Sequence, residues 1–148
     1  MNAGYHIVIP ARLASQRLPG KPLVMIAGRP LIEHVWRRAC EANAGSVVIA
    51  TDSEQIFQAA ASFGAEAVMT DAGHESGSDR IAECVDLKGW DDQTLIVNLQ
   101  GDEPLMPPAC LEQVAGLLQQ DRSADVASLY WPINTVVEVE DPNLSLIH

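Results

Sequence analysis

The sequence predicts an α/β fold in which a mostly parallel sheet is covered by helices on both faces. Short apolar runs alternate along the chain with longer segments whose apolar residues recur at helical spacing. The runs are unbroken, as in Val47-Val48-Ile49, which is typical of strands buried on both faces. With 148 residues, 47% of them hydrophobic, the chain fits one domain with a sizeable core.

The first half of the chain predicts two strands and two helices. A strand is expected at residues 5–9, and a helix at 30–42, because Pro30 fits a first helical turn and apolar residues then recur at helical spacing, namely Leu31, Ile32, Val35, Trp36 and Ala39. Trp36 is expected to face the core. A second strand at 46–51 leads into a helix that begins at Asp52 or Ser53 and ends before Gly64. Asp52 is expected to cap this helix rather than to take part in catalysis.

The second half continues the alternation. The expected elements are, in order, a strand at residues 67–70, a polar loop at 71–77, a helix at 78–86, a strand at 94–99, a helix that Pro107 and Pro108 open, and a fifth strand at 126–131. The last helix carries four apolar residues on one face, namely Leu111, Val114, Ala115 and Leu118.

One stretch is purely cationic in a chain of net charge −11. Four of the nine basic residues, Arg12, Arg17, Lys21 and Arg29, fall within 18 positions, and the first carboxylate is Glu33. Such clustering suits a polyanion such as a nucleoside triphosphate. The acidic balance of the whole chain argues against nucleic acid or an anionic membrane as a partner.

The cationic stretch is expected to form a ligand-binding loop. Three prolines and Gly20 oppose regular structure, and a loop after a strand of a parallel sheet lies where such folds bind ligands. The stretch is not a Gly-rich P-loop, because Ser15 stands at the first glycine position and Pro22 follows Lys21. From the charges alone, a solvated basic loop is an equally good interpretation.

Four motifs resemble the sugar nucleotidyltransferases and, in detail, the 3-deoxy-manno-octulosonate (Kdo) cytidylyltransferases. They are Pro10-Ala-Arg-x-x-Ser-x-Arg-Leu-Pro-Gly-Lys-Pro-Leu23, Ala50-Thr-Asp52, His74-Glu-Ser-Gly-Ser-Asp-Arg80 and Val97-Asn-Leu-Gln-Gly-Asp-Glu-Pro104. The resemblance implies a Rossmann-like nucleotide-diphospho-sugar transferase fold, CTP and Kdo as substrates, and Mg²⁺ as cofactor. In the implied reaction the anomeric hydroxyl of Kdo attacks the α-phosphorus of CTP, which yields CMP-Kdo for lipopolysaccharide biosynthesis and releases pyrophosphate.

The resemblance also implies roles for individual residues. Arg12 and Lys21 would bind the β- and γ-phosphates with support from Arg17, and Asp102 would hold Mg²⁺; Arg12, Lys21 and Asp102 are thus the catalytic candidates. The remaining substrate-binding positions are the backbone at Ala11 for the base, Ser76, Gly77 and Arg80 against the base and ribose, and Gln100 for the sugar or a metal-bound water.

The residues alone leave alternatives open. Asp102 ends the fourth strand, where a carboxylate faces the ligand crevice and suits Mg²⁺, but Gly-Asp-Glu-Pro is equally typical of a turn. Ser78 and Asp79 can simply cap a helix, and Arg80 can simply pair with a neighbouring carboxylate. His74 is expected to be a surface or hydrogen-bonding residue rather than a general base.

Other features indicate a cytoplasmic protein. No apolar run approaches the length of a membrane-spanning helix, and the first residues do not match a signal peptide. Cys40, Cys84 and Cys110 are far apart and form no C-x-x-C pair, which predicts reduced, mostly buried thiols in helices and no zinc site.

Two other functions remain open from the sequence: a cytidylyltransferase for another acidic sugar, such as a sialic acid, and a non-catalytic CTP-binding module. The resemblance extends from about Ile7 to about Asn143, and the final residues depart from the family pattern. Residues 1–148 are therefore expected to be the nucleotide-binding portion of a single domain. The absent portion would supply sugar contacts, a second metal carboxylate and a dimer surface.

This expectation predicts that the 148-residue chain self-associates and does not turn over. An uncovered sheet edge or apolar patch drives association between copies. Light scattering should give a mass above that of one chain, and mixtures with CTP, Kdo and Mg²⁺ should release no pyrophosphate. A clean monomer, or turnover like that of an intact enzyme, would contradict the prediction.

Overall fold

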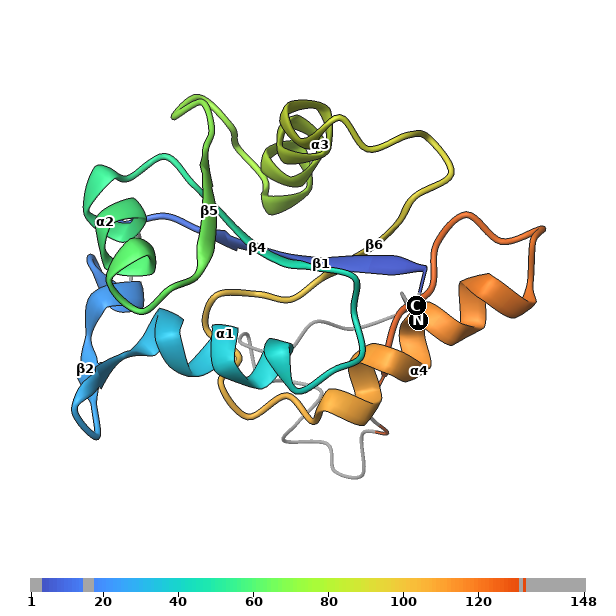
Figure 1. Cartoon of the computed structure of the whole chain (residues 1–148), viewed down its shortest axis with the longest axis horizontal. Helices are drawn as coiled ribbons and strands as arrows, with labels where there is room; N and C mark the ends of the chain where they lie inside the picture. Colours follow the sequence, from blue (N-terminus) through green and yellow to red (C-terminus); the bar gives the residue numbers. More distant parts are fainter. Residues whose placement is uncertain (1–3, 15–17, 131, 133–148) are drawn as a thin grey trace.

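A four-stranded parallel sheet forms the centre of the computed structural model, which describes residues 4–14, 18–130 and 132 (Figure 1). Its strands are β1 (Tyr5–Ala11), β4 (Val47–Thr51), β5 (Glu66–Met69) and β6 (Leu95–Asn98). They lie in the order β5-β4-β1-β6, with every neighbouring pair parallel. The predicted fold class is therefore confirmed.

Helices cover both faces of this sheet, as the unbroken apolar strands predicted. On one face lie α1 (Leu31–Cys40), α2 (Glu54–Ser62) and α4 (Pro108–Gln120), whose apolar residues form the larger core cluster with β1, β4 and β6. On the other face α3 (Gly77–Lys88) lies alone, and Figure 1 shows it above the sheet while α1 and α4 lie below. Ile81 and Cys84 of α3 pack there on Val8, Val48 and Ala50.

The chain reverses its winding direction at β1. From β1 it passes through α1 to β4 and through α2 to β5, moving outward along one side of the sheet. It then crosses the opposite face through α3 and reaches β6, on the other side of β1. The carboxyl ends of β1 and β6 thus flank a topological switch point, where open α/β sheets bind ligands.

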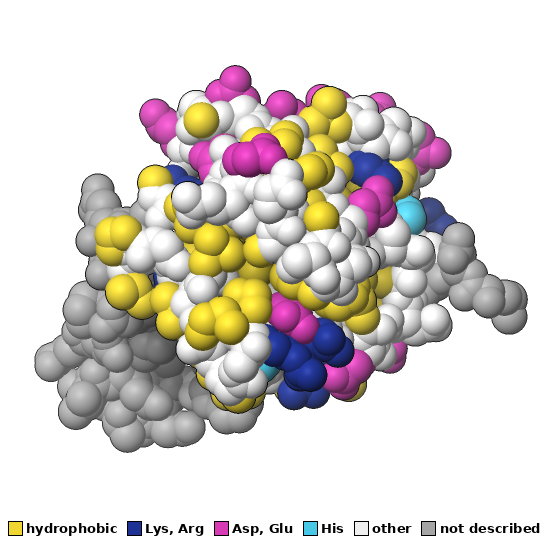
Figure 2. All heavy atoms as spheres, turned by 60° about the vertical axis from the view of Figure 1, so that its left-hand side comes forward, with side chains coloured by type: hydrophobic (Ala, Val, Ile, Leu, Met, Phe, Trp, Pro, Cys, Tyr) yellow, Lys and Arg dark blue, Asp and Glu magenta, His cyan; other side chains and the backbone are white. Residues whose placement is uncertain are grey.

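A short hairpin follows the cationic stretch. The 3-10 turn η1 (Lys21–Leu23) leads into β2 (Met25–Ile26) and β3 (Arg29–Pro30), which pair antiparallel. The two-residue turn places Ala27 at φ 49° and Gly28 at φ 80°, as a twisted two-residue hairpin requires. The side of the molecule that carries this hairpin exposes apolar side chains on its surface (Figure 2), among them Val24, Met25 and Ile26.

The expected boundaries are off by one or two residues at the ends of several elements, β1 and α3 among them. β1 does not stop at Ile9 but continues through Pro10 to Ala11. Proline is tolerated there because β6 pairs with β1 only as far as Val8, so that Pro10 has a ladder partner only on the β4 side. Likewise, α3 begins at Gly77 and extends to Lys88.

The helix caps also differ from the expected ones. Ser53, not Asp52, caps α2, because the Ser53 hydroxyl accepts a hydrogen bond from the Ile56 amide at 3.3 Å. Ser76, rather than Ser78 or Asp79, caps α3 and accepts from the Asp79 amide at 3.1 Å. Both serines have extended backbone, which the cap position requires.

The prediction of a fifth strand at residues 126–131 is wrong for residues 126–130, which are the part that the structure describes. Residues 126–130 form no strand, and Val126 and Tyr130 are each 80% exposed. A ladder requires a neighbouring strand about 4.8 Å away. Instead, residues 125–129 border a hollow of about 530 Å³ together with β6 and α4. Trp131 lies outside the described residues.

The remaining expectations concern single side chains. Trp36 is partly buried and packs on Phe63 with ring centroids 5.4 Å apart, as expected for a core residue. All three cysteines are free thiols in helices, although only Cys84 is buried, and burial raises its pKa to about 11. Among the described residues, no helix combines the length and the apolar character needed to cross a bilayer.

Candidate active site

A cavity of about 220 Å³ opens at the switch point. Three parts of the chain form its walls: the end of β1 with the start of the cationic loop, the loop that enters α3, and the turn after β6. Its lining residues are Pro10, Ala11, Arg12, Lys21, Pro22, His74, Glu75, Ser76, Gly77, Arg80, Gln100, Gly101 and Asp102.

The cavity brings together nearly all the residues that the sequence singled out. Ala11, Arg12, Lys21, Ser76, Gly77, Arg80, Gln100 and Asp102 all line it. Arg17 lies outside the described residues. Arg29, the fourth cation of the stretch, does not line the cavity, because its guanidinium lies 3.4 Å from the carboxylate of Glu33 at the start of α1. The cationic stretch is therefore divided between the site and the hairpin.

The two strongest candidates for phosphate and metal binding contact each other. Lys21 Nζ, in η1, lies 2.9 Å from Asp102 Oδ2 in the turn after β6. Both side chains are about half exposed, so water screens the pair and its contribution to stability is small. The pair joins two segments 81 residues apart at the mouth of the cavity. It also places a cationic head and a hard anionic oxygen next to each other.

Gly101 allows the turn after β6 to approach the end of β1. A Cβ atom added at Gly101 would lie 3.0 Å from the Pro10 carbonyl oxygen and 3.5 Å from Ala11 Cβ. The first distance is tighter than an ordinary contact, so the Pro10 carbonyl would have to give way by a few tenths of an ångström to a side chain at this position. The glycine of the Gln-Gly-Asp-Glu-Pro motif thus holds Asp102 close to the cationic loop.

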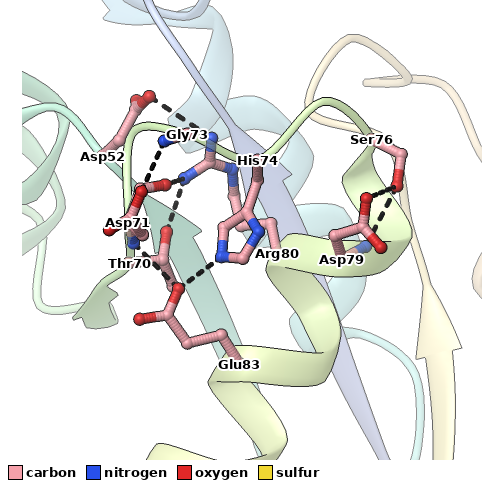
Figure 3. Close-up of polar contacts among 9 residues, drawn as sticks. All are labelled: Asp52, Thr70, Asp71, Gly73, His74, Ser76, Asp79, Arg80 and Glu83. Carbon is pink, nitrogen blue, oxygen red and sulfur yellow. Dashed lines mark hydrogen bonds and ion pairs between the residues drawn. The ribbon is translucent and has the colours of Figure 1, made fainter.

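Arg80 is buried at the back of the cavity, with 3% of its surface exposed. Its guanidinium donates to Thr70 Oγ1 at 2.5 Å, to the Asp71 carbonyl at 3.2 Å and to Asp52 Oδ2 at 3.3 Å (Figure 3). Asp52, which does not cap α2, is instead the partner of this buried cation. Arg80 therefore joins the ends of β4 and β5 to α3 while forming part of the cavity wall.

The loop that enters α3 is held by residues that the sequence did not single out for the site. Glu83, on α3, accepts from the Asp71 amide at 2.8 Å and from His74 Nε2 at 2.5 Å through the same oxygen, Oε2. His74 is thus a hydrogen-bonding residue, as expected. The two hydrogen bonds, from Asp71 first, lower the pKa of Glu83 below its ordinary value.

Gln100 and Glu103 flank Asp102 and differ in their surroundings. Gln100 Nε2 donates to Asn98 Oδ1 at 3.0 Å and the residue lines the cavity. Glu103 lines the separate hollow beside β6 and does not line the cavity. Loss of surrounding water, and then the charge of Asp102, raises the pKa of Glu103.

The donor set at the cavity fits a hard divalent cation that a ligand helps to bind. Among the described residues, no group of three or more His, Cys, Asp or Glu side chains could hold a metal by itself. Mg²⁺ commonly takes one or two carboxylates and completes its shell with phosphate oxygens and water. Asp102 supplies one such carboxylate at the mouth of the cavity.

Comparison with known sequences points to one family. Residues 6–147 match the family model described as cytidylyltransferase. A protein of Thioalkalivibrio sulfidiphilus named 3-deoxy-manno-octulosonate cytidylyltransferase is 54% identical over 140 residues, which are 95% of this chain and 56% of the relative. A protein of Pseudomonas fluorescens with the same name is 46% identical over 144 residues, covering 97% of this chain and 57% of the relative. The chain thus spans little more than half the length of these relatives.

Solved structures agree. The structure of a CMP:2-keto-3-deoxy-manno-octonic acid synthetase complexed with CTP matches 80% of this chain and 49% of that protein, with a TM-score of 0.74 and 41% identity. A cytidylyltransferase from Leptospira borgpetersenii matches 81% of this chain and 50% of that protein, with a TM-score of 0.69. At 23% identity the second likeness shows the fold alone.

We predict that Gly101→Ala lowers the free energy of unfolding, because its Cβ would crowd the Pro10 carbonyl. Overpacking of this kind costs about 1–3 kcal/mol. Gly116→Ala, in the open face of α4, is the control: an added Cβ there meets nothing within 4 Å, and alanine is the better helix former. Urea unfolding measures both. If Gly101→Ala were as stable as the wild type, the two walls would not be in close contact.

Proposed function

The chain belongs to the cytidylyltransferase family, and on this basis we propose that it carries the CTP-binding part of a Kdo cytidylyltransferase. The complete reaction would join CMP to the anomeric hydroxyl of Kdo and release pyrophosphate, a cytoplasmic step of lipopolysaccharide biosynthesis. Support comes from the names of the relatives at 46–54% identity and from the CTP complex of a structure 41% identical to this chain.

The observation that carries the proposal is the convergence of opposite charges at one cavity. Arg12, Lys21 and Asp102 come from two segments far apart in the sequence, and all three line the mouth at the switch point. A triphosphate requires cations for its oxygens, and the divalent ion that accompanies it requires a carboxylate. Arg12 and Lys21 thus concentrate positive charge at this cavity in a chain whose net charge is −11.

The chemistry assigned to these residues is positioning and charge stabilisation. Nucleotidyl transfer requires the attacking oxygen and the leaving pyrophosphate in line, with the charge on the leaving oxygens neutralised. We assign Arg12 and Lys21 to the β- and γ-phosphates, so that they stabilise pyrophosphate as it leaves. We assign the base and ribose to the opposite wall, formed by Ser76, Gly77 and the backbone near Ala11.

A divalent cation, Mg²⁺ in our proposal, would be held by Asp102 together with the phosphates. Bound there, it would supply charge neutralisation between the phosphate oxygens. Lys21 and Asp102 are partners of opposite charge 2.9 Å apart. Nucleotide and cation together would satisfy both groups, because each would gain a partner of opposite charge.

Nucleotide binding is the experiment that tests the proposal. Calorimetric titration of the chain with CTP, UTP and ATP in the presence of Mg²⁺ should show preferential binding of CTP. Pyrophosphate release in the presence of Kdo or of a sialic acid would identify the sugar and show that residues 1–148 hold a complete site, whereas CTP binding without release is the outcome expected of a CTP-binding part. Equal affinity for the three nucleotides would contradict the assignment.

We predict that Lys21→Ala weakens CTP binding more than CMP binding, because Lys21 is assigned to the outer phosphates. Loss of one hydrogen bond between charged groups should cost about 1.5–3 kcal/mol for CTP. The control is Lys88→Ala, which removes a lysine that pairs with Glu66 at the far end of α3. Titration calorimetry measures both nucleotides, and equal losses for CTP and CMP would contradict the assignment.

We predict that Asp102→Asn abolishes the enhancement of CTP binding by Mg²⁺ while the protein still unfolds cooperatively. Without Mg²⁺ the variant should bind CTP at least as tightly as the wild type, because the carboxylate no longer neutralises Lys21 or repels the triphosphate. Asp92→Asn, on an exposed turn before β6, is the control. Overlaying Mg²⁺ titrations for Asp102→Asn and the wild type would reduce Asp102 to a turn residue.

A further inference from the structure

Both backbone polar groups of Asp71 are held from one helix. The Asp71 N–H donates to Glu83 Oε2 at 2.8 Å, and the Asp71 carbonyl accepts from Arg80 Nη1 at 3.2 Å. Arg80 and Glu83 are three residues apart on α3 and therefore project from the same face of the helix. Figure 3 shows both side chains reaching from α3 toward the Asp71 segment.

The turn that follows is fixed by two further contacts. Asp71 Oδ1 accepts from the Gly73 amide at 2.6 Å, which closes a local turn. His74 Nε2 then lies 2.5 Å from Glu83 Oε2. Because an ionised carboxylate only accepts hydrogen bonds, the proton of this contact lies on His74 Nε2. Glu83 thus ties both ends of the segment 71–74 to α3 through a single oxygen.

The segment leads directly into the cavity wall. His74, Glu75, Ser76 and Gly77 line the cavity, whereas Glu83 does not. At the far end of this wall, a Cβ added at Gly77 would lie 3.4 Å from Pro10 Cγ, so the wall packs against the end of β1. The position of the wall is therefore set by α3 on one side and by β1 on the other.

We propose that Glu83 is a positioning residue of the nucleotide site, which sets the wall at residues 74–77 by accepting hydrogen bonds from Asp71 and His74. The inference rests on the proposed function, since it concerns the wall assigned to the base and ribose. Glu83 acts through this loop and touches no substrate.

Geometry, and not charge, makes this role specific. A carboxylate near a site for a triphosphate repels the ligand, so the charge of Glu83 opposes binding. Its two hydrogen bonds require one acceptor oxygen at a fixed reach from α3. The lowered pKa of Glu83 follows from the same two contacts. Their contribution to stability is complete above the ordinary glutamate pKa and is lost as the pH falls through the lowered pKa.

Two substitutions separate reach from charge. Glu83→Gln keeps an oxygen at the same reach and removes the charge, whereas Glu83→Asp keeps the charge and withdraws the oxygen by one methylene. Titration calorimetry with CTP and Mg²⁺ should show binding by Glu83→Gln within about threefold of the wild type, and binding by Glu83→Asp weaker by about tenfold. Asp86→Ala, which removes a carboxylate from an exposed position of α3, should bind CTP like the wild type.

The outcomes decide the proposal. Binding by Glu83→Asp that equals or exceeds binding by Glu83→Gln would overturn it, because charge would then matter more than reach. Equal binding by all the variants would overturn it as well. Urea unfolding shows whether each variant retains a cooperative fold. Both substitutions conserve most of the side chain. The Glu83 side chain is 31% exposed in the wild type, so neither change disturbs the buried core, and we expect both variants to fold.

Hydrogen exchange separates this proposal from the proposed function. The amide of Asp71 should exchange faster in Glu83→Asp than in Glu83→Gln, whether or not the chain binds CTP. If the wild type fails to bind CTP while the exchange rates differ in this order, the proposed function fails and the hold of Glu83 on the loop stands. If the exchange rates of the two variants are equal, the positioning role fails, whatever the affinity for CTP.

Discussion

The pairing of β1 on both sides is the constraint on which the rest of the structure depends. Because β4 lies on one side and β6 on the other, the chain must reverse its winding direction and cross the second face of the sheet through α3. This crossing brings the cationic loop and Asp102 to the same edge of the sheet. It also aims the N-terminus of α3 and its entry loop at that edge, so a single topological choice assembles all three walls of the cavity.

Two pairs of opposite charges lie at this cavity. Lys21 contacts Asp102 at the exposed mouth, and Arg80 contacts Asp52 at the buried back. The two pairs differ in consequence. The exposed pair is screened by water, and its members are free to exchange partners. The buried guanidinium of Arg80 also donates to Thr70 and to the Asp71 carbonyl. It cannot leave without breaking the contacts that connect β4 and β5 to α3. The mouth is suited to ligand exchange and the back to rigidity.

The sequence predicted the four paired strands, the four helices and eight of the residues that line the cavity, because hydrophobic spacing and short motifs are local signals. It failed where a neighbour in space decides the outcome. Residues 126–130 have the composition of a strand but lie beside a hollow, and Asp52 pairs with Arg80, which is 28 residues away in the sequence. The partners of Glu83 are set by how the loop folds back on α3. Its place one turn after Arg80, on the same helical face, was the only local signal for it.

The two strands that pair with β1 lie at very different distances from it along the chain, so they become available at different times during synthesis. Ile7 pairs with Val47, 40 residues later, whereas Tyr5 pairs with Leu95, 90 residues later. While the ribosome is still translating the residues between β4 and β6, β1 and β4 can already form a parallel pair, but the other edge of β1 stays unpaired. Contacts at such long separation form slowly, because the closure of a long loop precedes them. The ligand cavity, which needs β6 and its turn, therefore forms only after the β1–β4 pair can form.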